Sequence, residues 1–247
     1  MINLPAYVWA LTFLGAVGVP AVTCLSLYRG GLSARAAVLT GMVFGGWITA
    51  SALLADSGAY HAKSASSVPW FAVAFAATLT VCLAATRLPA ISRALAGPDT
   101  AARLATPHTL RVAGVAFLIA AELGHLPAAF ALPAGLGDIA VGLSAPFVAR
   151  RLARGGRDAR RGALWFNILG LLDLAVALAM GVLTGIGAQQ ILHVTPSSEA
   201  LSLLPLALIP TTAVPLLAAL HIISLRRLPT SGEPTADRRV DALAHLG

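Results

Sequence analysis

The chain has 247 residues, of which 57% are hydrophobic and only 11% are charged. A soluble globular domain of this length carries roughly 25% charged residues. The composition therefore argues against an ordinary soluble domain and predicts an all-α integral membrane protein that crosses the bilayer several times. The net charge is +7, but the basic residues flank apolar segments and are not interleaved with aromatic residues on a polar surface, which argues against nucleic-acid binding.

The first apolar segment follows a start, "MINLPAYVWALTFLG", that has no basic n-region. We therefore expect this segment to be retained as a membrane span and not cleaved as a signal peptide. Seven apolar segments are long enough to cross a hydrocarbon core of about 30 Å. They lie near residues 5–28, 36–56, 68–87, 109–126, 129–149, 162–184 and 201–225. This spacing predicts a seven-helix transmembrane domain over residues 1–228.

The basic residues predict the orientation of this domain. All sixteen Arg follow spans one, three, five and seven, and Lys63 is the single basic residue on the other side. Arg111 is assigned here to the loop between spans three and four. Because cytoplasmic loops are rich in Lys and Arg, we expect an external N-terminus and a cytoplasmic C-terminus in the cell (inner, cytoplasmic) membrane.

Two further features concern the organisation of the chain. Residues 229–247 are polar, begin with several Pro and Gly, and are predicted to form a flexible cytoplasmic tail. "GGLSAR" at 30–35 is echoed by "GGRDAR" at 155–160, and the same offset carries Gly45 onto Gly170. This echo suggests a 3+1+3 parallel pseudo-repeat of the kind that some small transporters contain.

Ionisable side chains lie deep in several of the predicted spans. Counting about 1.5 Å per helical residue from the nearest Arg places Glu122 about 16 Å, and Asp138 and Asp173 about 18 Å, from the cytoplasmic edge. The same count places His125, Thr211 and Thr212 about 21 Å from that edge. These six residues come from four spans and are predicted to form a cluster near the middle of the bilayer.

The chemistry of this cluster follows from the cost of burying charge. A carboxylate in hydrocarbon costs about 3 kcal/mol or more, so it should face the bundle interior and have a partner. With Arg111 assigned to a loop, no Arg or Lys is expected at this depth. The partners would then be His125, the Thr hydroxyls, water or a cation, and at least one acid should hold a proton at neutral pH. Glu122, Asp138 and Asp173 are therefore the candidate proton-binding residues.

A second polar set is predicted nearer the cytoplasm. Asn167 and His221 lie about 9 Å and 8 Å from that edge, and His221 shares a helix face with Thr211. His125 and His221 are candidate proton relays. Pro205, Pro210 and Pro215 should bend the last span and leave carbonyls unpaired inside the bundle. Trp47 lies deeper than the other Trp residues and is a candidate for lining a cavity.

Structural roles compete with these functional ones. Asp138 lies among small residues in "PAGLGDIAVG", where it could hydrogen-bond a neighbouring helix. His125 could face solvent at a span end, Asn167 could hold two helices together, and His221 is close to the headgroup level. Cys24 and Cys82 have no CxxC partner, so we expect them to pack as small apolar residues without a disulfide or zinc site.

Three classes of function fit these features. The first is a small transporter coupled to protons or cations through the buried acids. The second is an intramembrane enzyme that uses a buried carboxylic acid as general acid on a lipid-like or isoprenoid substrate, such as a membrane-bound terpene cyclase, although aromatic residues make up only 6% of the chain. The third is a non-catalytic membrane subunit, an assembly factor or a sensor.

Cofactor chemistry receives no support from the sequence. No HExxH or HxxxH pair is present, which argues against a metal-dependent hydrolase. The last span contains no Lys for a retinal Schiff base, and His125 and His221 are predicted at depths too different for haem ligation. We therefore predict no metal and no cofactor, and the expected partners are the lipid bilayer and a small-molecule or apolar substrate whose identity the sequence does not give.

Overall fold

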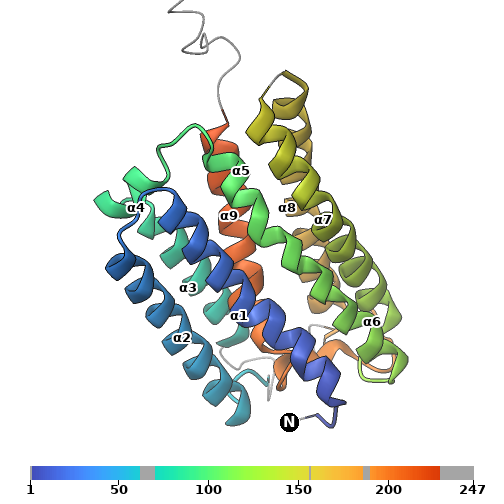
Figure 1. The fold of residues 1–247 in the computed structure, drawn as a ribbon. Helices are drawn as coiled ribbons and strands as arrows, with labels where there is room; N and C mark the ends of the chain where they lie inside the picture. The colour runs from blue at the N-terminus through green and yellow to red at the C-terminus, as the bar shows by residue number, and fades with distance from the viewer. Residues whose placement is uncertain (1, 62–69, 156, 186–189, 229–247) are drawn as a thin grey trace, which may run out of the picture.

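The computed structural model describes residues 2–61, 70–155, 157–185 and 190–228. Lys63 and the predicted tail 229–247 lie outside these residues. Throughout the described part the secondary structure is helical, and the helices run side by side as a bundle (Figure 1). Six helical stretches are long and apolar enough to span a membrane, which confirms the prediction of a multi-pass helical membrane protein.

The long helices are α1 (Ala6–Arg29), α2 (Ala34–Asp56), α7 (Ala128–Arg154) and α8 (Arg157–Leu183). α9 (Val214–Arg227) continues the π-helical turn before it, and together they form the helical stretch Ile209–Arg227. α3 (Trp70–Ala85) is a shorter apolar helix. Between α3 and α7 lie α4 (Pro89–Ala94), α5 (Thr100–Ala105), the 3₁₀ helix η1 (Thr106–Gly114) and α6 (Val115–Glu122). Before α9 the chain forms η3 (Ser198–Ser202) and the π-helical turn η4 (Ile209–Ala213).

A polar residue caps the start of α2, and a glycine ends α7. The Ser33 hydroxyl accepts a hydrogen bond from the Ala36 N–H at the start of α2, at 3.3 Å. Gly155 has a positive φ of 76° and ends α7, and its N–H donates to the carbonyls of Arg151 and Leu152. This turn makes α7 and α8 a tight hairpin whose end carries the Arg-rich segment.

α9 lies at the centre of the bundle and α2 at its edge. In an apolar window of 18 residues, 78% of the residues are buried within Ile209–Arg227 but only 6% within Ala34–Asp56. α9 is therefore surrounded by other helices, and α2 lies at the periphery (Figure 1). The N-terminus and the end of α9 lie at opposite ends of the bundle, and α1, α7 and α9 each end in Arg at the same end as one another.

The stretch predicted as the fourth span has other bounds in the structure. It was expected at 109–126 but runs from Thr100 to Glu122, through α5, η1 and α6. Its first turns contain Arg103, which hydropathy assigns to a loop. The Arg103 guanidinium donates to the backbone carbonyls of Ser26 and Ala94, at 2.8 and 3.1 Å. Because protein groups take the place of water around this charge, the helix continues through it.

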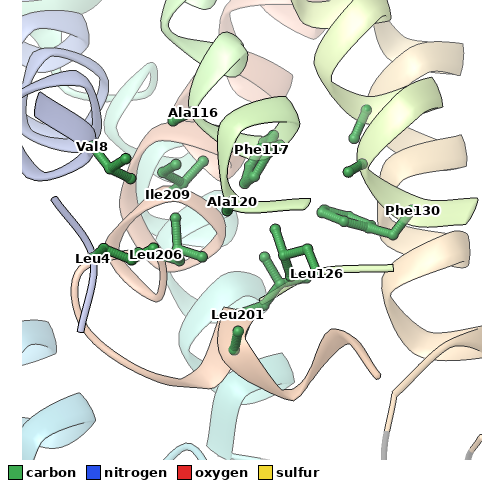
Figure 2. Close-up of a cluster of buried hydrophobic side chains, with 13 residues drawn as sticks. Leu4, Val8, Ala116, Phe117, Ala120, Leu126, Phe130, Leu201, Leu206 and Ile209 are labelled. Carbon is green, nitrogen blue, oxygen red and sulfur yellow. The ribbon is translucent and has the colours of Figure 1, made fainter. Parts of the chain in front are cut away.

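The last segment also begins later than predicted. It was expected from residue 201, but the continuous helical stretch starts at Ile209. Pro205 and Pro210 lack the N–H that an α-helix needs, and the chain between them forms turns. The buried side chains of this region pack with Leu4 and Val8 of the N-terminal segment and with Phe117 and Phe130 (Figure 2).

Glycine allows two neighbouring segments to approach closely at the centre. A Cβ added at Gly142 of α7 would lie 2.7 Å from the backbone nitrogen and 2.9 Å from Cγ1 of Val112 in η1. Since backbone cannot move aside cheaply, any larger residue would push η1 away from α7. This close approach places the residues of η1 against the middle of α7.

We predict that Gly142→Ala lowers the free energy of unfolding by about 1–3 kcal/mol through overpacking. Gly46→Ala is the matched control, because a Cβ at this position of α2 meets no atom within 4 Å. The control should be neutral or gain up to about 1 kcal/mol from helix propensity. Thermal unfolding of the purified variants in detergent tests the pair, and equal stabilities would contradict the proposed close packing.

Candidate functional site around a buried arginine

Arg111 lies midway along the segment Thr100–Glu122, and its side chain is 0% exposed. Its Nε–H donates to Asp138 Oδ1 at 2.7 Å, and its Nη2–H donates to Asp173 Oδ2. The two carboxylates come from α7 and α8, so one guanidinium joins three helical segments. The planar group with its fixed N–H directions suits this arrangement better than a flexible ammonium would.

The remaining amino group of Arg111 faces α8 and α9. Nη1 lies 3.5 Å from the Gly170 carbonyl and 3.2 Å from Nε2 of His221. Because Arg only donates hydrogen bonds, Nε2 of His221 must be the acceptor, which leaves the proton on Nδ1. Nδ1 lies 2.9 Å from Oδ1 of Asn167, which accepts this proton in a hydrogen bond. The neighbours of His221 thus hold it as one neutral tautomer.

The hydrogen-bonded chain continues beyond His221. Nδ2 of Asn167 donates to the Ala163 carbonyl at 2.7 Å and to the Ser224 hydroxyl at 3.1 Å. An amide side chain and a guanidinium do not exchange protons readily, so a continuous proton wire does not follow from this chain. The geometry instead favours a positioning role for His221 and Asn167, which orient Arg111, over the proton relay predicted for His221.

Glycines make room for this network. A Cβ at Gly114 would overlap Asp138, one at Gly137 would overlap the Asp173 carboxylate, and one at Gly170 would overlap the His221 ring. The polar side chains therefore lie directly against neighbouring helix backbones. Small residues inside membrane helices permit this close approach.

His108 is a further buried residue next to the network. Its ring stacks on His221 with centroids 3.8 Å apart and meets Phe166 edge-on at 5.5 Å. Within the part of the chain that the structure describes, neither of its ring nitrogens has a hydrogen-bond partner. His108 precedes Arg111 by three residues in η1, so both side chains point toward α9.

A second polar network surrounds η4. Pro215 has no N–H to bond the Thr211 carbonyl one turn earlier. That carbonyl accepts hydrogen bonds from Trp47 Nε1 at 3.0 Å and from the Thr78 hydroxyl at 3.2 Å. The Thr211 hydroxyl in turn lies 2.7 Å from the Ser51 hydroxyl, which lies 3.0 Å from the Tyr60 hydroxyl. The bend expected from proline is therefore stabilised by α2 and α3.

The structure brings together some of the predicted site residues and separates others. Asp138 and Asp173 meet at Arg111, and Asn167 and His221 belong to the same network instead of a separate set. Thr211 and Trp47 belong to the second network, and the Thr212 hydroxyl donates to the Leu208 carbonyl of its own helix. The polar residues thus form two networks on either side of the η4–α9 segment.

The positions predicted for Arg111, Glu122 and His125 are wrong. Arg111 is not a loop residue, and a basic group does exist among the buried acids. Glu122 and His125 were counted from Arg111 as if it lay at the membrane edge. Because Arg111 lies midway along its segment, Glu122 is exposed at the end of α6 and His125 lies in the turn that follows.

Sequence reasoning missed Arg111, Ser51, Tyr60, Thr78 and Ser224 as members of these networks, and it missed His108 beside them. Only Arg111 could have been found from the sequence. Buried carboxylates without a nearby cation are costly, so an Arg close to them in the bundle was to be expected. Metal binding gains no candidate from the structure. Among the residues it describes, no three His, Cys, Asp or Glu side chains are grouped to hold a metal ion.

A cavity adjoins the network at Asp138. It has a volume of about 280 Å³ and lies between α3 and α8, bounded by α6, α7 and the η3–η4 region. Its walls include the aromatic residues Tyr60, Trp70, Phe71, Phe75, Phe117 and Phe130. Asp138 is thus shared by the Arg111 network and the cavity. Burial raises the pKa of Tyr60, so its hydroxyl stays protonated at neutral pH.

A protein-family model matches this chain. The model of a domain of unknown function, DUF8737, matches residues 68–229. The chain belongs to the DUF8737 family. No curated protein and no solved structure matches it. The segment matched to DUF8737 contains Arg111, Asp138, Asp173, Asn167 and His221, whereas Trp47 and Ser51 precede it.

We predict that Arg111→Leu lowers stability by about 3–5 kcal/mol, because it leaves two carboxylates buried without their partner. The matched control is the triple variant Arg111→Leu, Asp138→Asn, Asp173→Asn, which removes all three charges together. This control should recover most of the lost stability, as measured by thermal unfolding in detergent. If the single and triple variants were equally unstable, the ion pairs would not be the source of the effect.

Proposed function

We propose that this chain is a small membrane transporter that exchanges a proton for another cation at Arg111, Asp138 and Asp173. The single observation that carries the proposal is the charge count at this site. Two carboxylates face one guanidinium, and His221 is held neutral, so the buried group has one negative charge in excess when both acids are ionised. A proton or another cation is required to balance it.

The position of the site suits exchange across a bilayer. Arg111 lies midway along a membrane-spanning segment, and Asp138 borders a cavity that extends toward η3 at one end of the bundle. A cation that enters this cavity reaches the excess carboxylate directly. Binding of the cation and release of the proton then compete for the same charge, which is the requirement for coupling.

The proposed topology has seven spans, with α3 as the seventh, an external N-terminus and a cytoplasmic C-terminus in the cell membrane. Its support is the position of the Arg residues at helix ends. α1, α7 and α9 carry Arg in their last turns, and these turns lie at the same end of the bundle. The positive-inside rule assigns such an end to the cytoplasm.

One observation favours the enzyme as a second candidate. Six aromatic residues converge on the cavity, which provides the π faces that cation-forming chemistry on an isoprenoid needs. The role of Asp138 argues against it. A general acid donates its proton to the substrate, whereas Oδ1 of Asp138 already accepts a hydrogen bond from the Nε–H of Arg111. This contact suits charge balance with Arg111 and a bound cation better than proton donation.

Exchange is tested in inverted membrane vesicles from cells that express the protein. Respiration acidifies the lumen, and a pH-sensitive dye reports whether an added cation dissipates the gradient. With the wild-type chain we expect Na⁺, K⁺ or a tetraalkylammonium ion to dissipate it. Asp173→Asn should abolish the response, because neutralising one acid removes the excess charge.

The matched control for this experiment is Glu122→Gln, which changes a carboxylate that the structure places at the exposed end of α6. This variant should exchange as the wild type does. Protein amounts in the vesicles are compared by immunoblot. A response that is equal in wild type and Asp173→Asn, or absent for every cation tested, would overturn the proposed function.

A further inference from the structure

The cavity beside Asp138 has features that specify the class of ligand it accepts. Phe117 and Phe130 meet edge-to-face at a centroid distance of 5.3 Å, and Figure 2 shows both within a cluster of buried hydrophobic side chains. Leu174, Ala177 and Leu178 of α8 form the opposite wall. The wall is therefore mostly apolar and aromatic, as is usual for sites that bind small organic molecules.

The charged groups of the cavity are all acidic. Asp138 lies in the middle of the bundle, and Glu199 of η3 lies toward its end. Glu199 is paired with His61, at 2.6 Å. Among the described residues that line the cavity, none is Lys, Arg or His. An anionic ligand would meet Asp138 with no compensating group on the wall, whereas a cation would be attracted to it.

We propose that this cavity binds an apolar organic cation, an aromatic or alkyl ammonium compound whose charged nitrogen lies against Asp138. This inference names the substrate class of the exchange proposed above, and so it rests on that function. The aromatic side chains of Trp70, Phe71 and Phe75 provide apolar contact for the organic part of the ligand. The ammonium group supplies the positive charge that the two carboxylates and Arg111 lack.

Access to the cavity differs between an apolar cation and Na⁺ or K⁺. α3 and α8 each pack against α9 and make little direct contact with one another, so the cavity lies in the gap between them. Trp70 and Val182, on the two rims, are 54% and 57% exposed on the outer surface of the bundle. A ligand dissolved in the bilayer therefore reaches the cavity sideways, whereas a hydrated inorganic ion would enter from the η3 end, where Ser198, Glu199 and Ser202 line the cavity.

The ligand class is tested with three probes that share one ring. 1-Naphthylmethylamine is a cation at neutral pH, 1-naphthylmethanol is neutral and 1-naphthoate is an anion. Binding to the purified full chain in detergent is measured by isothermal titration calorimetry, with empty micelles as the blank. We expect the amine to bind at least tenfold more tightly than the alcohol, and the acid to show no binding.

Two variants locate the binding in the cavity. Ala177→Phe fills the cavity and should abolish amine binding, whereas Ala179→Phe, on the exposed side of the same helix, should preserve it. Asp138→Asn should reduce the preference for the amine over the alcohol by at least tenfold. If Asp138→Asn does not fold, the two Ala variants still decide the question.

The outcomes separate this inference from the function on which it rests. Equal binding of amine and acid, or amine binding that survives Ala177→Phe, would overturn the ligand class. If Na⁺ or K⁺ exchanges for protons in vesicles while the amine does not bind, the transporter stands and the ligand class fails. If the amine binds as predicted but no cation exchanges for protons, the site stands and transport fails.

Discussion

The guanidinium of Arg111 is the constraint on which the rest of this structure depends. A charge in the middle of an apolar bundle is costly unless its N–H groups are bonded. Its partners are Asp138 on α7, Asp173 on α8 and His221 on α9, so these helices must converge on η1 at one level. Only glycine fits at positions 114, 137 and 170, because Asp138, Asp173 and His221 occupy the space that a larger side chain would need.

The two polar networks connect different sets of helices in the bundle. The Arg111 network joins η1, α7, α8 and α9, whereas the Thr211 network joins η4 to α2 and α3. Both are consequences of irregular backbone. The 3₁₀ geometry of η1 redirects its side chains, and the π-helical turn η4 leaves a carbonyl free. Membrane proteins tolerate such irregular backbone where other protein groups form hydrogen bonds with it. Function is expected where η4 and Asp138 border the cavity.

How far the site could be predicted depended on where depth was counted from. The depths of Asp138 and Asp173 were counted from Arg residues that do lie near helix ends, and the prediction that the two carboxylates lie close together could be made from the sequence. Glu122 and His125 were counted from Arg111, which hydropathy assigned to a loop, and their depths were wrong. Hydropathy scores a residue as if it faced lipid or water, and it cannot represent a cation whose neighbours are carboxylates from other helices.

The sequence by itself determined that this is an apolar helical membrane protein, because long uncharged stretches and Arg-terminated segments are local properties of the chain. It also indicated that Asp138 and Asp173 lie inside the bundle, although it placed Glu122 there wrongly, and that proline would disturb the last segment. Only the tertiary structure decided that Arg111 neutralises these acids, that His221 is a fixed neutral tautomer, and that aromatic residues from α3, α6 and α7 share one cavity. These are contacts between residues far apart in the chain, and no local pattern encodes which helix faces which.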